Sequence, residues 1–466
     1  MGEHQKRGSF SGSIGFVLAA AGSAVGLGNI WRFPYLAAKD GGGVFLLCYV
    51  ILALTFGFAL LTSEIAIGRK TRLSPLSAYG SLSKKFGWVG VLACIIPALI
   101  LPYYCVIGGW ILKYLATYVT GNAALAVSDG FFTGFITSQF SPIFWFAIYI
   151  LATAFVVYKG VNSGIEKFST FIMPVLLVFI LGISIFSLTL SHTDANGVTR
   201  TGIEGLMIYA VPNFEGMTLQ KFITVLMDAM GQLFYSISVA MGIMITYGSY
   251  VKKETNLVKS VNQIEIFDTG VAFLAGLMIV PAVYTFMGTE GMASGPSLMF
   301  VSLPKVFNSM GAIGPTIGII FFLMVAFAAL TSSVSVMEAV VSSMMDHFHM
   351  ERKRATILVT IVTLIAGIVV CLGYNVLYFD IVLPNGSHAQ VLDVMDYASN
   401  YILMPVVAIA TCALIGWVLK PKTVIDEVTN NGTLKFGREK LYVVMIKYIT
   451  PIMLLFLLLQ SLGLFM

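Results

Sequence analysis

Charged residues are scarce in this sequence. Asp, Glu, Lys and Arg make up only 11% of its 466 residues, whereas they make up about a quarter of a soluble domain. Hydrophobic residues account for 58%, and the mean hydropathy is +0.90. This composition excludes an ordinary soluble domain and predicts an integral membrane protein. The net charge of +5 gives no reason to expect a nucleic-acid partner.

Cysteine and histidine are also rare, with five of each in the chain. The cysteines form no CxxC pair and lie in or near apolar runs, at Cys48, Cys94, Cys105, Cys371 and Cys412. We therefore interpret them as packing residues and not as disulfides or metal ligands. His347 and His349 are neighbours in a polar loop but have no third ligand beside them, so a zinc site is not expected.

Long apolar runs, in contrast, are abundant. A membrane-spanning helix needs about 20 apolar residues. The runs predict about eleven spans, at residues 14–37, 43–68, 88–120, 143–158, 166–190, 219–248, 264–288, 312–345, 355–374, 397–419 and 441–465. No separate soluble domain fits between them, so residues 1–466 are expected to form a single transmembrane domain.

The basic residues predict the orientation of these spans. Cytoplasmic loops are enriched in Lys and Arg. If the N-terminus lies inside, most of the 27 basic residues fall in inner loops. An odd number of spans then places the C-terminus outside. We expect a multi-pass protein of the cell membrane with a cytoplasmic N-terminus and an extracellular C-terminus.

Two of the predicted helices carry polar, glycine-rich interruptions. The first segment contains AGSAVGLGNIWRFP (residues 21–34), and the sixth contains GQLFYSISVAMG (residues 231–242). One GxxxG pattern alone is more typical of helix packing. Two breaks five segments apart favour an inverted-repeat transporter, with repeats at 14–190 and 219–419 and an extra helix at 441–465.

The broken segments suggest what is transported. Unwound backbone must line a cavity, because lipid cannot satisfy its polar groups. Free carbonyls suit a cation such as sodium, and the N-terminal end of a half-helix suits a carboxylate. Asp268 has no basic partner nearby in its segment, and Thr331, Ser332 and Ser333 place three hydroxyls within one turn. These features indicate co-transport of sodium with an anionic or zwitterionic solute. For the hydroxyls, bonding to carbonyls of their own helix is the alternative.

The combined motifs resemble those of the neurotransmitter:sodium symporters. The motifs that carry the resemblance are GSAVGLGNIWRFPY, DGGGVF, PYY, GQLFYSIS, ALTSSVSVME and LDVMDY, spread over nearly the whole chain. The resemblance implies an all-α protein with the LeuT-type fold, a 5+5 inverted repeat with helices 1 and 6 broken. It also implies sodium-coupled secondary active symport by alternating access, and no enzymatic activity.

The resemblance assigns two sodium sites and a substrate site. The first sodium would bind Ala24, Asn29, Ser236 and Asp268, and the second would bind Gly22, Val25, Ala328, Thr331 and Ser332. The substrate would contact Ala24, Val25, Gly26, Leu27, Gly28, Ile100, Tyr104, Tyr235, Ser236, Ser238, Met241, Ser332 and Val336. This pocket is mostly apolar, with an adaptable methionine, and it predicts a large hydrophobic or aromatic amino acid. A smaller neutral amino acid is the alternative; a monoamine is disfavoured because Ser23 and Ala24 offer no carboxylate.

The same resemblance predicts gates and an ion dependence. Arg32 and Asp396 would close over the substrate, and Arg7 and Asp346 would form an inner latch, although Arg7 also fits plain positive-inside charge. Asp268 stands where many members have Asn and would supply the negative charge that chloride supplies elsewhere. We therefore expect chloride-independent transport, although Tyr49, Gln232 and Ser236 keep part of the chloride-site pattern and Ala272 adds no polar group.

Other classes fit the sequence less well. A channel would need pore-lining symmetry, and a membrane enzyme would need paired catalytic groups. Glu64 and Glu338 lie near inner helix ends and are interpreted as packing or gating contacts. An amino-acid sensor on the same fold is the remaining alternative. The expected partners are a small amino acid, sodium and the lipid bilayer, with the protein as a monomer or a weak homodimer.

Overall fold

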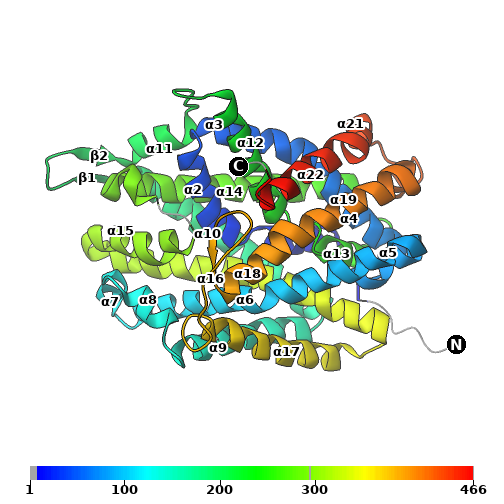
Figure 1. Ribbon diagram of the computed structural model, residues 1–466, viewed down its shortest axis with the longest axis horizontal. Helices are drawn as coiled ribbons and strands as arrows, with labels where there is room; N and C mark the ends of the chain where they lie inside the picture. The colour runs from blue at the N-terminus through cyan, green and yellow to red at the C-terminus, as the bar shows by residue number, and fades with distance from the viewer. Residues whose placement is uncertain (1–7, 293–294, 465–466) are drawn as a thin grey trace.

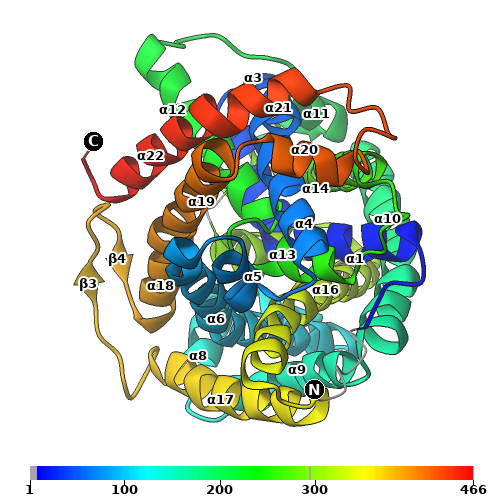
Figure 2. The ribbon, with the colours of Figure 1, turned by 90° about the vertical axis from the view of Figure 1, so that its right-hand side faces the viewer.

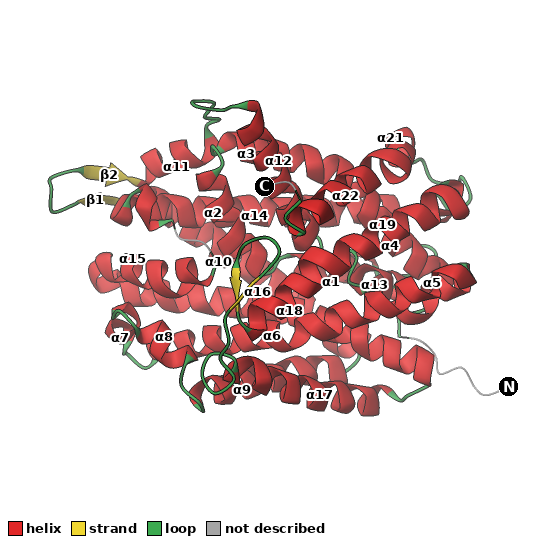
Figure 3. Ribbon diagram, in the orientation of Figure 1, coloured by secondary structure: helices red, strands yellow, loops and turns green. Residues whose placement is uncertain are grey.

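The structure is a computed structural model that describes residues 8–292 and 295–464. Most of this part is helical, and the strands in it form only two short antiparallel hairpins (Figure 3). In the first, β1 (Ser191–Thr193) pairs with β2 (Thr199–Thr201), and Ser191 lies opposite Thr201. In the second, β3 (Ile381–Val382) pairs with β4 (His388–Ala389). The all-α prediction is confirmed.

The helices follow the predicted order of spans. In the first half they are α1 (Ser13–Ala24), α2 (Phe33–Lys39), α3 (Gly43–Leu52), α4 (Phe58–Thr71), α5 (Pro75–Leu82), α6 (Gly87–Val119), α7 (Ala123–Val127), α8 (Phe131–Ile136), α9 (Ser141–Tyr158), α10 (Lys167–Leu188) and α11 (Gly202–Ala210). In the second half they are α12 (Leu219–Ser236), α13 (Ile243–Tyr250), α14 (Leu257–Met287), α15 (Leu303–Ser309), α16 (Gly314–Phe348), α17 (Arg352–Leu372), α18 (Val391–Asp396), α19 (Met404–Ala413), α20 (Lys422–Val428), α21 (Glu439–Val444) and α22 (Thr450–Ser461). Short π-helical turns join several neighbours into longer rods, at Gly28–Arg32, Ala53–Gly57, Val161–Glu166, Tyr397–Leu403, Leu414–Val418 and Met445–Ile449.

Nine helical stretches in the described residues are long and apolar enough to cross a membrane. The pair Ser13–Ala24 and Gly28–Lys39, bent by 55°, makes a tenth. The pair α12 and α13, separated by residues 237–242, occupies the predicted sixth segment. Both predicted breaks are therefore present. The division into two five-helix repeats stays a prediction.

The long helices lie side by side across the view of Figure 1, with the β1–β2 hairpin and α15 at one end and α5 and α21 at the other. Seen from that second end, α4 and α13 lie inside the bundle, whereas α17, α21 and α22 lie at its periphery (Figure 2). The long helix α16 packs against α1, α6, α9 and α10, and α13 packs against α4. The unwound parts of the two broken helices, residues 25–27 and 237–242, are buried within the bundle and so are shielded from lipid.

Candidate functional site

The first break lies between α1 and the π-helical turn that begins at Gly28. Val25 caps α1 in an extended conformation, with φ −75° and ψ 90°. A Cβ on Gly26 would lie 2.9 Å from the Ser332 hydroxyl and 3.0 Å from the Tyr104 hydroxyl. A Cβ on Gly28 would lie 3.0 Å from the Tyr235 ring. The glycines of the motif therefore allow polar and aromatic groups of three other helices to approach the backbone closely.

The second break separates α12 from α13 and is held in an unusual backbone conformation. Ser238, Ala240 and Gly242 have positive φ values of 55°, 62° and 74°. Non-glycine residues rarely adopt this region, so the surrounding structure must hold them there. The buried Glu64 does so, because its Oε1 accepts a hydrogen bond of 2.6 Å from the Ala240 amide. Glu64, interpreted from the sequence as a packing or gating contact, thus fixes the link that carries Ser238 and Met241.

The two breaks enclose a small cavity of about 30 Å³, the central cavity. It is lined by Ser23, Ala24, Gly26, Leu27, Gly28, Asn29, Ile100, Tyr104, Tyr235, Ser236, Ser238, Met241, Ser332 and Val336. Every predicted substrate contact except Val25 lines it. Ser23 was missed, although it directly precedes Ala24 in the same break. Its hydroxyl donates to Ser238 Oγ at 3.1 Å, and this pair bridges the two unwound segments.

Oxygen atoms converge on one side of this cavity around Asp268. Ser236 Oγ lies 2.7 Å from Asp268 Oδ1 and 2.9 Å from Asn29 Oδ1. The Asn29 amide also donates to Asp268 Oδ1, at 2.9 Å. All three side chains are buried, and in the described part of the chain no Lys or Arg pairs with Asp268. Carboxylate, amide and hydroxyl oxygens without a basic partner are a suitable environment for a hard cation.

A second group of oxygens surrounds Ser332 on α16. Its hydroxyl lies 3.3 Å from the Gly22 carbonyl, 3.0 Å from the Ser23 carbonyl and 3.3 Å from the Val25 carbonyl. A hydroxyl has one proton and can satisfy only one of these acceptors at a time. The remaining carbonyls are left facing the same point, which suits a cation.

The neighbouring Thr331 behaves differently from Ser332. Its hydroxyl donates to the Ala328 carbonyl of its own helix at 2.9 Å, as the alternative for such residues predicted. The Thr331 side chain nevertheless faces the break, since a Cβ on Gly22 would lie 3.3 Å from Thr331 Cβ. Ser333 points elsewhere and lies 2.9 Å from the Thr153 hydroxyl. The three hydroxyls of this turn therefore contact different parts of the structure.

The residues that resemble a chloride site are directed at Asp268 and at the first break. Tyr49 donates to Asp268 Oδ2 at 3.4 Å. Gln232 Nε2 donates to the Gly28 carbonyl at 3.0 Å. Ala272, on the same helix as Asp268, is fully buried and brings no polar group. Of these two donors, Tyr49 thus faces an ionisable carboxyl group and Gln232 faces a backbone carbonyl.

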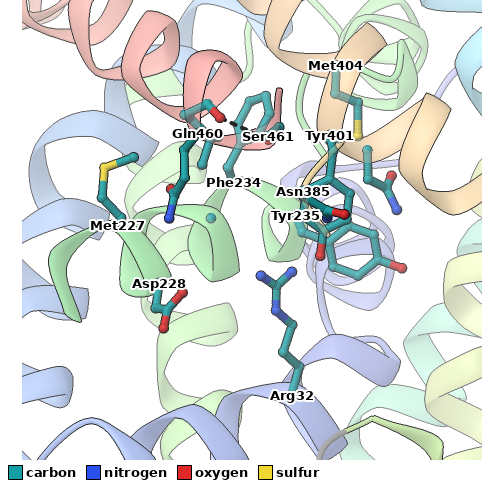
Figure 4. A pocket seen from close by; sticks show the side chains of 13 residues that line it. Arg32, Met227, Asp228, Phe234, Tyr235, Asn385, Tyr401, Met404, Gln460 and Ser461 are labelled. Carbon is teal, nitrogen blue, oxygen red and sulfur yellow. Dashed lines mark hydrogen bonds between the residues drawn. The ribbon is translucent and has the colours of Figure 1, made fainter. Parts of the chain in front are cut away.

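A larger cavity of about 280 Å³, the outer cavity, lies beside the central one. Figure 4 shows the Arg32 guanidinium pointing into it, between Asp228 on one side and Tyr235 and Tyr401 on the other. Arg32 lies 5.9 Å from the centre of the Tyr401 ring. Asp228, which the sequence analysis missed, also pairs with Lys39 at 3.0 Å. Its place on the broken helix α12, seven residues before Tyr235, was the available signal.

The predicted outer gate consists of Arg32 and Asp396, which both lie near the outer cavity but do not form an ion pair with each other. Among the described residues, no ion pair within 4.0 Å connects Arg32 with Asp396. Asp396 instead accepts a hydrogen bond of 2.6 Å from Asn400, which also donates to the Tyr103 hydroxyl at 3.1 Å. Arg32, Asp228 and Asn400 line the outer cavity, so Asp396 lies one hydrogen bond away from that lining. The outer gate therefore stays a prediction.

A second charged network joins α13, α16 and α17. Glu338 on α16 accepts two hydrogen bonds from Arg352, at 2.7 Å and 2.8 Å, and one of 2.5 Å from the Tyr250 hydroxyl. This joins α13 to α16 and α17, so Glu338 is a contact between helices. Asp346, the predicted latch residue, accepts a hydrogen bond of 2.6 Å from the Ser74 amide. Its predicted partner Arg7 lies outside the described residues.

Comparison with known proteins shows to which family this chain belongs. The sequence matches the model of the Sodium:neurotransmitter symporter family over residues 7–130 and 125–465. The chain belongs to this family. It is a sodium-dependent symporter and a multi-pass membrane protein, and it is not an enzyme, because the family consists of transporters.

Individual relatives support the assignment of this chain to the symporter family. It is similar to the sodium-dependent transporter YhdH of Bacillus subtilis, with 32% identity over 467 residues covering 98% of both chains. The human sodium- and chloride-dependent GABA transporter 2 is 26% identical over 91% of this chain and 75% of its own. Among solved structures, MhsT in complex with L-phenylalanine superposes with a TM-score of 0.84 and 33% identity, covering 98% of this chain and all of MhsT. The symporter thus has the LeuT-type fold predicted from its sequence.

Proposed function

We propose that this symporter imports a neutral amino acid with a large hydrophobic or aromatic side chain, together with two sodium ions and without chloride. The observation that carries the proposal is the arrangement of both helix breaks around one small cavity. Its polar part is made by backbone and hydroxyl groups, and its apolar part by Ile100, Met241 and Val336. Among the described residues, no Lys, Arg, Asp or Glu lines it, so charged substrate side chains would be left unpaired.

The substrate ends are recognised by different parts of the cavity. The carboxylate binds at the Leu27–Gly28 amides and the Tyr104 hydroxyl, which already lies 3.5 Å from the Leu27 amide. The ammonium group binds carbonyls near Ala24 and Tyr235. MhsT, the relative with 33% identity, is described with bound L-phenylalanine, and a side chain of that size supports the choice of a large apolar substrate.

The two sodium ions occupy the two oxygen clusters. The first binds the Ala24 carbonyl, Asn29, Ser236 and Asp268. The second binds the carbonyls of Gly22, Val25 and Ala328 and the hydroxyls of Thr331 and Ser332. The distances among Asn29, Ser236 and Asp268 support the first set. The distances from Ser332 to the Gly22 and Val25 carbonyls support the second. The hydrogen bond from Tyr49 to Asp268 supports chloride independence, because a fixed carboxylate would repel an anion at that place.

The charge distribution of the loops supports the proposed orientation, with the N-terminus in the cytoplasm and the C-terminus outside. The arrangement as a monomer or a weak homodimer is proposed together with it. Labelling of single cysteines introduced at exposed positions of the terminal segments, in intact cells, distinguishes the two orientations.

The test of function uses purified protein and labelled L-phenylalanine. Binding is measured in sodium chloride, sodium gluconate and potassium chloride, with Trp, Tyr, Leu, Ala, Gly and Lys as competitors. We expect equal binding in both sodium salts, none in potassium, and displacement by the large apolar amino acids. Displacement by Gly or Ala alone would overturn the substrate class. Binding independent of sodium would overturn the ion sites.

Uptake into proteoliposomes then separates a transporter from a sensor. We expect accumulation driven by an inward sodium gradient. Tyr104→Phe removes the hydroxyl proposed to bind the carboxylate and should weaken binding about tenfold, a typical cost of a hydrogen bond to a charged group. Tyr103→Phe is the matched control, because the Tyr103 hydroxyl accepts its hydrogen bond from Asn400, which lines the outer cavity. Sodium-dependent binding without uptake would show a sensor.

A further inference from the structure

A lysine lies within the last membrane-spanning stretch without a charged partner. The stretch Glu439–Ser461 is 23 residues long, and Lys447 lies about 12 Å along it from its first residue. In the described part of the chain, Lys447 forms no ion pair and no hydrogen bond. A cation at this depth is costly and normally has a partner. The groups around Lys447 therefore indicate which interactions stabilise its positive charge.

Two aromatic rings form an open cage around the ammonium group. Lys447 Nζ lies 5.1 Å from the centre of the Trp417 ring and 5.3 Å from that of Tyr448. The two rings are perpendicular, with centres 5.7 Å apart. Trp417 is 59% exposed and Tyr448 47% exposed, so the cage opens at the outer surface of the protein. Cation–π contacts stabilise the charge in part but leave its ammonium protons without acceptors.

The cage sits where two helices cross closely. A Cβ on Gly416 would lie 3.3 Å from the Ile446 carbonyl and from Lys447 Cα. Figure 2 shows α21 and α22 along the outside of the bundle, with α19 and α20 beneath them. On the same helix face as the cage, Val444 and Ile452 are 45% and 55% exposed. With Tyr448 they recur every four residues and form a continuous apolar strip.

The surrounding segment is basic. Residues 417–447 contain Lys420, Lys422, Lys435, Arg438, Lys440 and Lys447 against Asp426, Glu427 and Glu439. Glu427 is already paired with Arg69 at 2.7 Å, and Arg438 is paired with Glu265 at 2.9 Å. Lys420, Lys422 and Lys440 are exposed and have no ion pair among the described residues. The positive charge of this segment is therefore available to attract an anion at the membrane surface.

We propose that Trp417, Lys447 and Tyr448 bind the headgroup phosphate of an anionic phospholipid. Its acyl chain lies along the strip of Val444, Tyr448 and Ile452. The phosphate accepts the ammonium protons that the rings leave free. A lipid without a cationic headgroup fits this place best, because the neighbouring lysines would repel a choline or ethanolamine group. This site does not depend on the proposed substrate or sodium stoichiometry.

Native mass spectrometry of the full-length protein in detergent tests the site. Phosphatidylglycerol and phosphatidylcholine are added separately, and bound lipid is counted on wild type, Lys447→Gln, Lys447→Arg and Lys113→Gln. Lys113 is the matched control, because it also stacks on an aromatic ring, at 5.8 Å from Phe131, but on α6. We expect Lys447→Gln to lower phosphatidylglycerol affinity about fivefold, the typical effect of one lysine at an anionic surface. Lys447→Arg and Lys113→Gln should retain the wild-type affinity for phosphatidylglycerol.

Two further measurements test whether the variants are folded and whether the acyl chain is needed for binding. Thermal unfolding of the lipid-free variants in detergent shows whether Lys447→Gln is folded; if it is not, Trp417→Leu replaces it in the lipid titration. Inorganic phosphate is added as a competitor, and we expect it not to displace the lipid, since it has no acyl chain. Equal retention of phosphatidylglycerol by wild type and folded Lys447→Gln, equal loss in Lys113→Gln, or equal binding of phosphatidylcholine would overturn the proposal.

Discussion

The side-chain amide of Asn29 donates a hydrogen bond of 2.9 Å to Asp268 Oδ1, joining the first break to a helix 239 residues further along the chain. Ser236 from the second break donates to the same oxygen. One carboxyl group therefore joins the residues that flank the two unwound segments, Asn29 after the first and Ser236 before the second. An ion bound here would stabilise the arrangement of both breaks at once, which links sodium binding to the shape of the substrate cavity.

Removal of the Asp268 charge should weaken sodium binding. Asp268→Asn keeps the size of the side chain and most of its hydrogen bonds, so the fold is retained. We expect the sodium concentration for half-maximal phenylalanine binding to rise about tenfold or more, since a hydrogen-bonded charge contributes roughly 1.5–3 kcal/mol. Sodium titrations in chloride and in gluconate measure it. An unchanged sodium titration would contradict the first site, and a wild-type protein that requires chloride would contradict chloride independence.

The second sodium site should respond to Ser332 and not to its neighbour. Ser332→Ala removes the hydroxyl that lies between three carbonyls, and we expect a higher sodium requirement and a less sigmoidal titration. Ser333→Ala is the matched control, because Ser333 is one residue away and contacts Thr153. A scintillation proximity assay with labelled phenylalanine measures both variants. If the two alanine variants behave alike, the site does not lie at Ser332.

The outer gate should appear as coupling between Arg32 and Asp396. In this structure the two are near each other but unpaired, so a pair would form only when the outer cavity closes. We expect Arg32→Gln and Asp396→Asn each to slow uptake about tenfold, and the double variant to be no slower than the worse single one. Uptake into proteoliposomes gives the rates. Lys305→Gln, which breaks an exposed pair with Asp129, should change little, and additive losses for the gate variants would exclude direct coupling.

Because the pKa of Asp40 is raised, we expect the stability of the folded protein to depend on pH. Burial, together with the nearby charge of Asp228, raises the pKa of Asp40 to about 7 from 3.8. The folded protein therefore holds this proton more tightly than the unfolded chain, and the contribution of Asp40 falls as pH rises from about 4 to about 7. We expect the melting temperature of Asp40→Asn to decline less than that of wild type between pH 5 and 8.

Asp194 provides the control of opposite sign for this experiment. Backbone hydrogen bonds from Val198 and Asn196 lower the pKa of Asp194, so its contribution is constant above pH 5. The melting curves of Asp194→Asn and wild type should therefore run parallel between pH 5 and 8. If Asp40→Asn also runs parallel to wild type, Asp40 does not titrate in this range.

The buried pair of Arg69 and Glu427 should be important for stability. Arg69 is fully buried, lies 2.7 Å from Glu427 and also donates to the Thr255 carbonyl at 2.8 Å. Arg69→Met removes the nearer partner of Glu427, leaving only Lys253 at 3.7 Å, and takes a donor from the Thr255 carbonyl. Breaking a buried pair in this way costs about 3–5 kcal/mol. We expect a markedly lower melting temperature in detergent. Arg354→Gln breaks an exposed pair with Glu351 and should cost only about 0–1 kcal/mol; similar losses would contradict a special role for burial.

Much of the architecture was predictable because hydrophobic length and glycine placement are local properties. A run of about 20 apolar residues is a span wherever it packs. The two glycine- and serine-rich motifs likewise break a helix through their own backbone preferences. The site residues could be listed by resemblance to the family, and the central cavity collects nearly all of the predicted substrate contacts.

Other features depend on partners that are distant in sequence. Glu64 contacts Ala240 and Asp228 contacts Lys39 only because separate helices meet there. Ser332 reaches the first break, whereas Thr331 bonds to its own helix and Ser333 faces Thr153. Three adjacent hydroxyls cannot be told apart by residue type. Their roles depend on the rotation of α16 against its neighbours.

The sequence by itself determined that this protein spans the membrane many times and breaks two of its helices, because composition and backbone preference act within a few residues. Tertiary structure alone decided which oxygens converge, which acidic groups are paired, and that Lys447 meets Trp417. Those contacts join residues up to hundreds of positions apart, and their geometry is set by how the helices pack against one another.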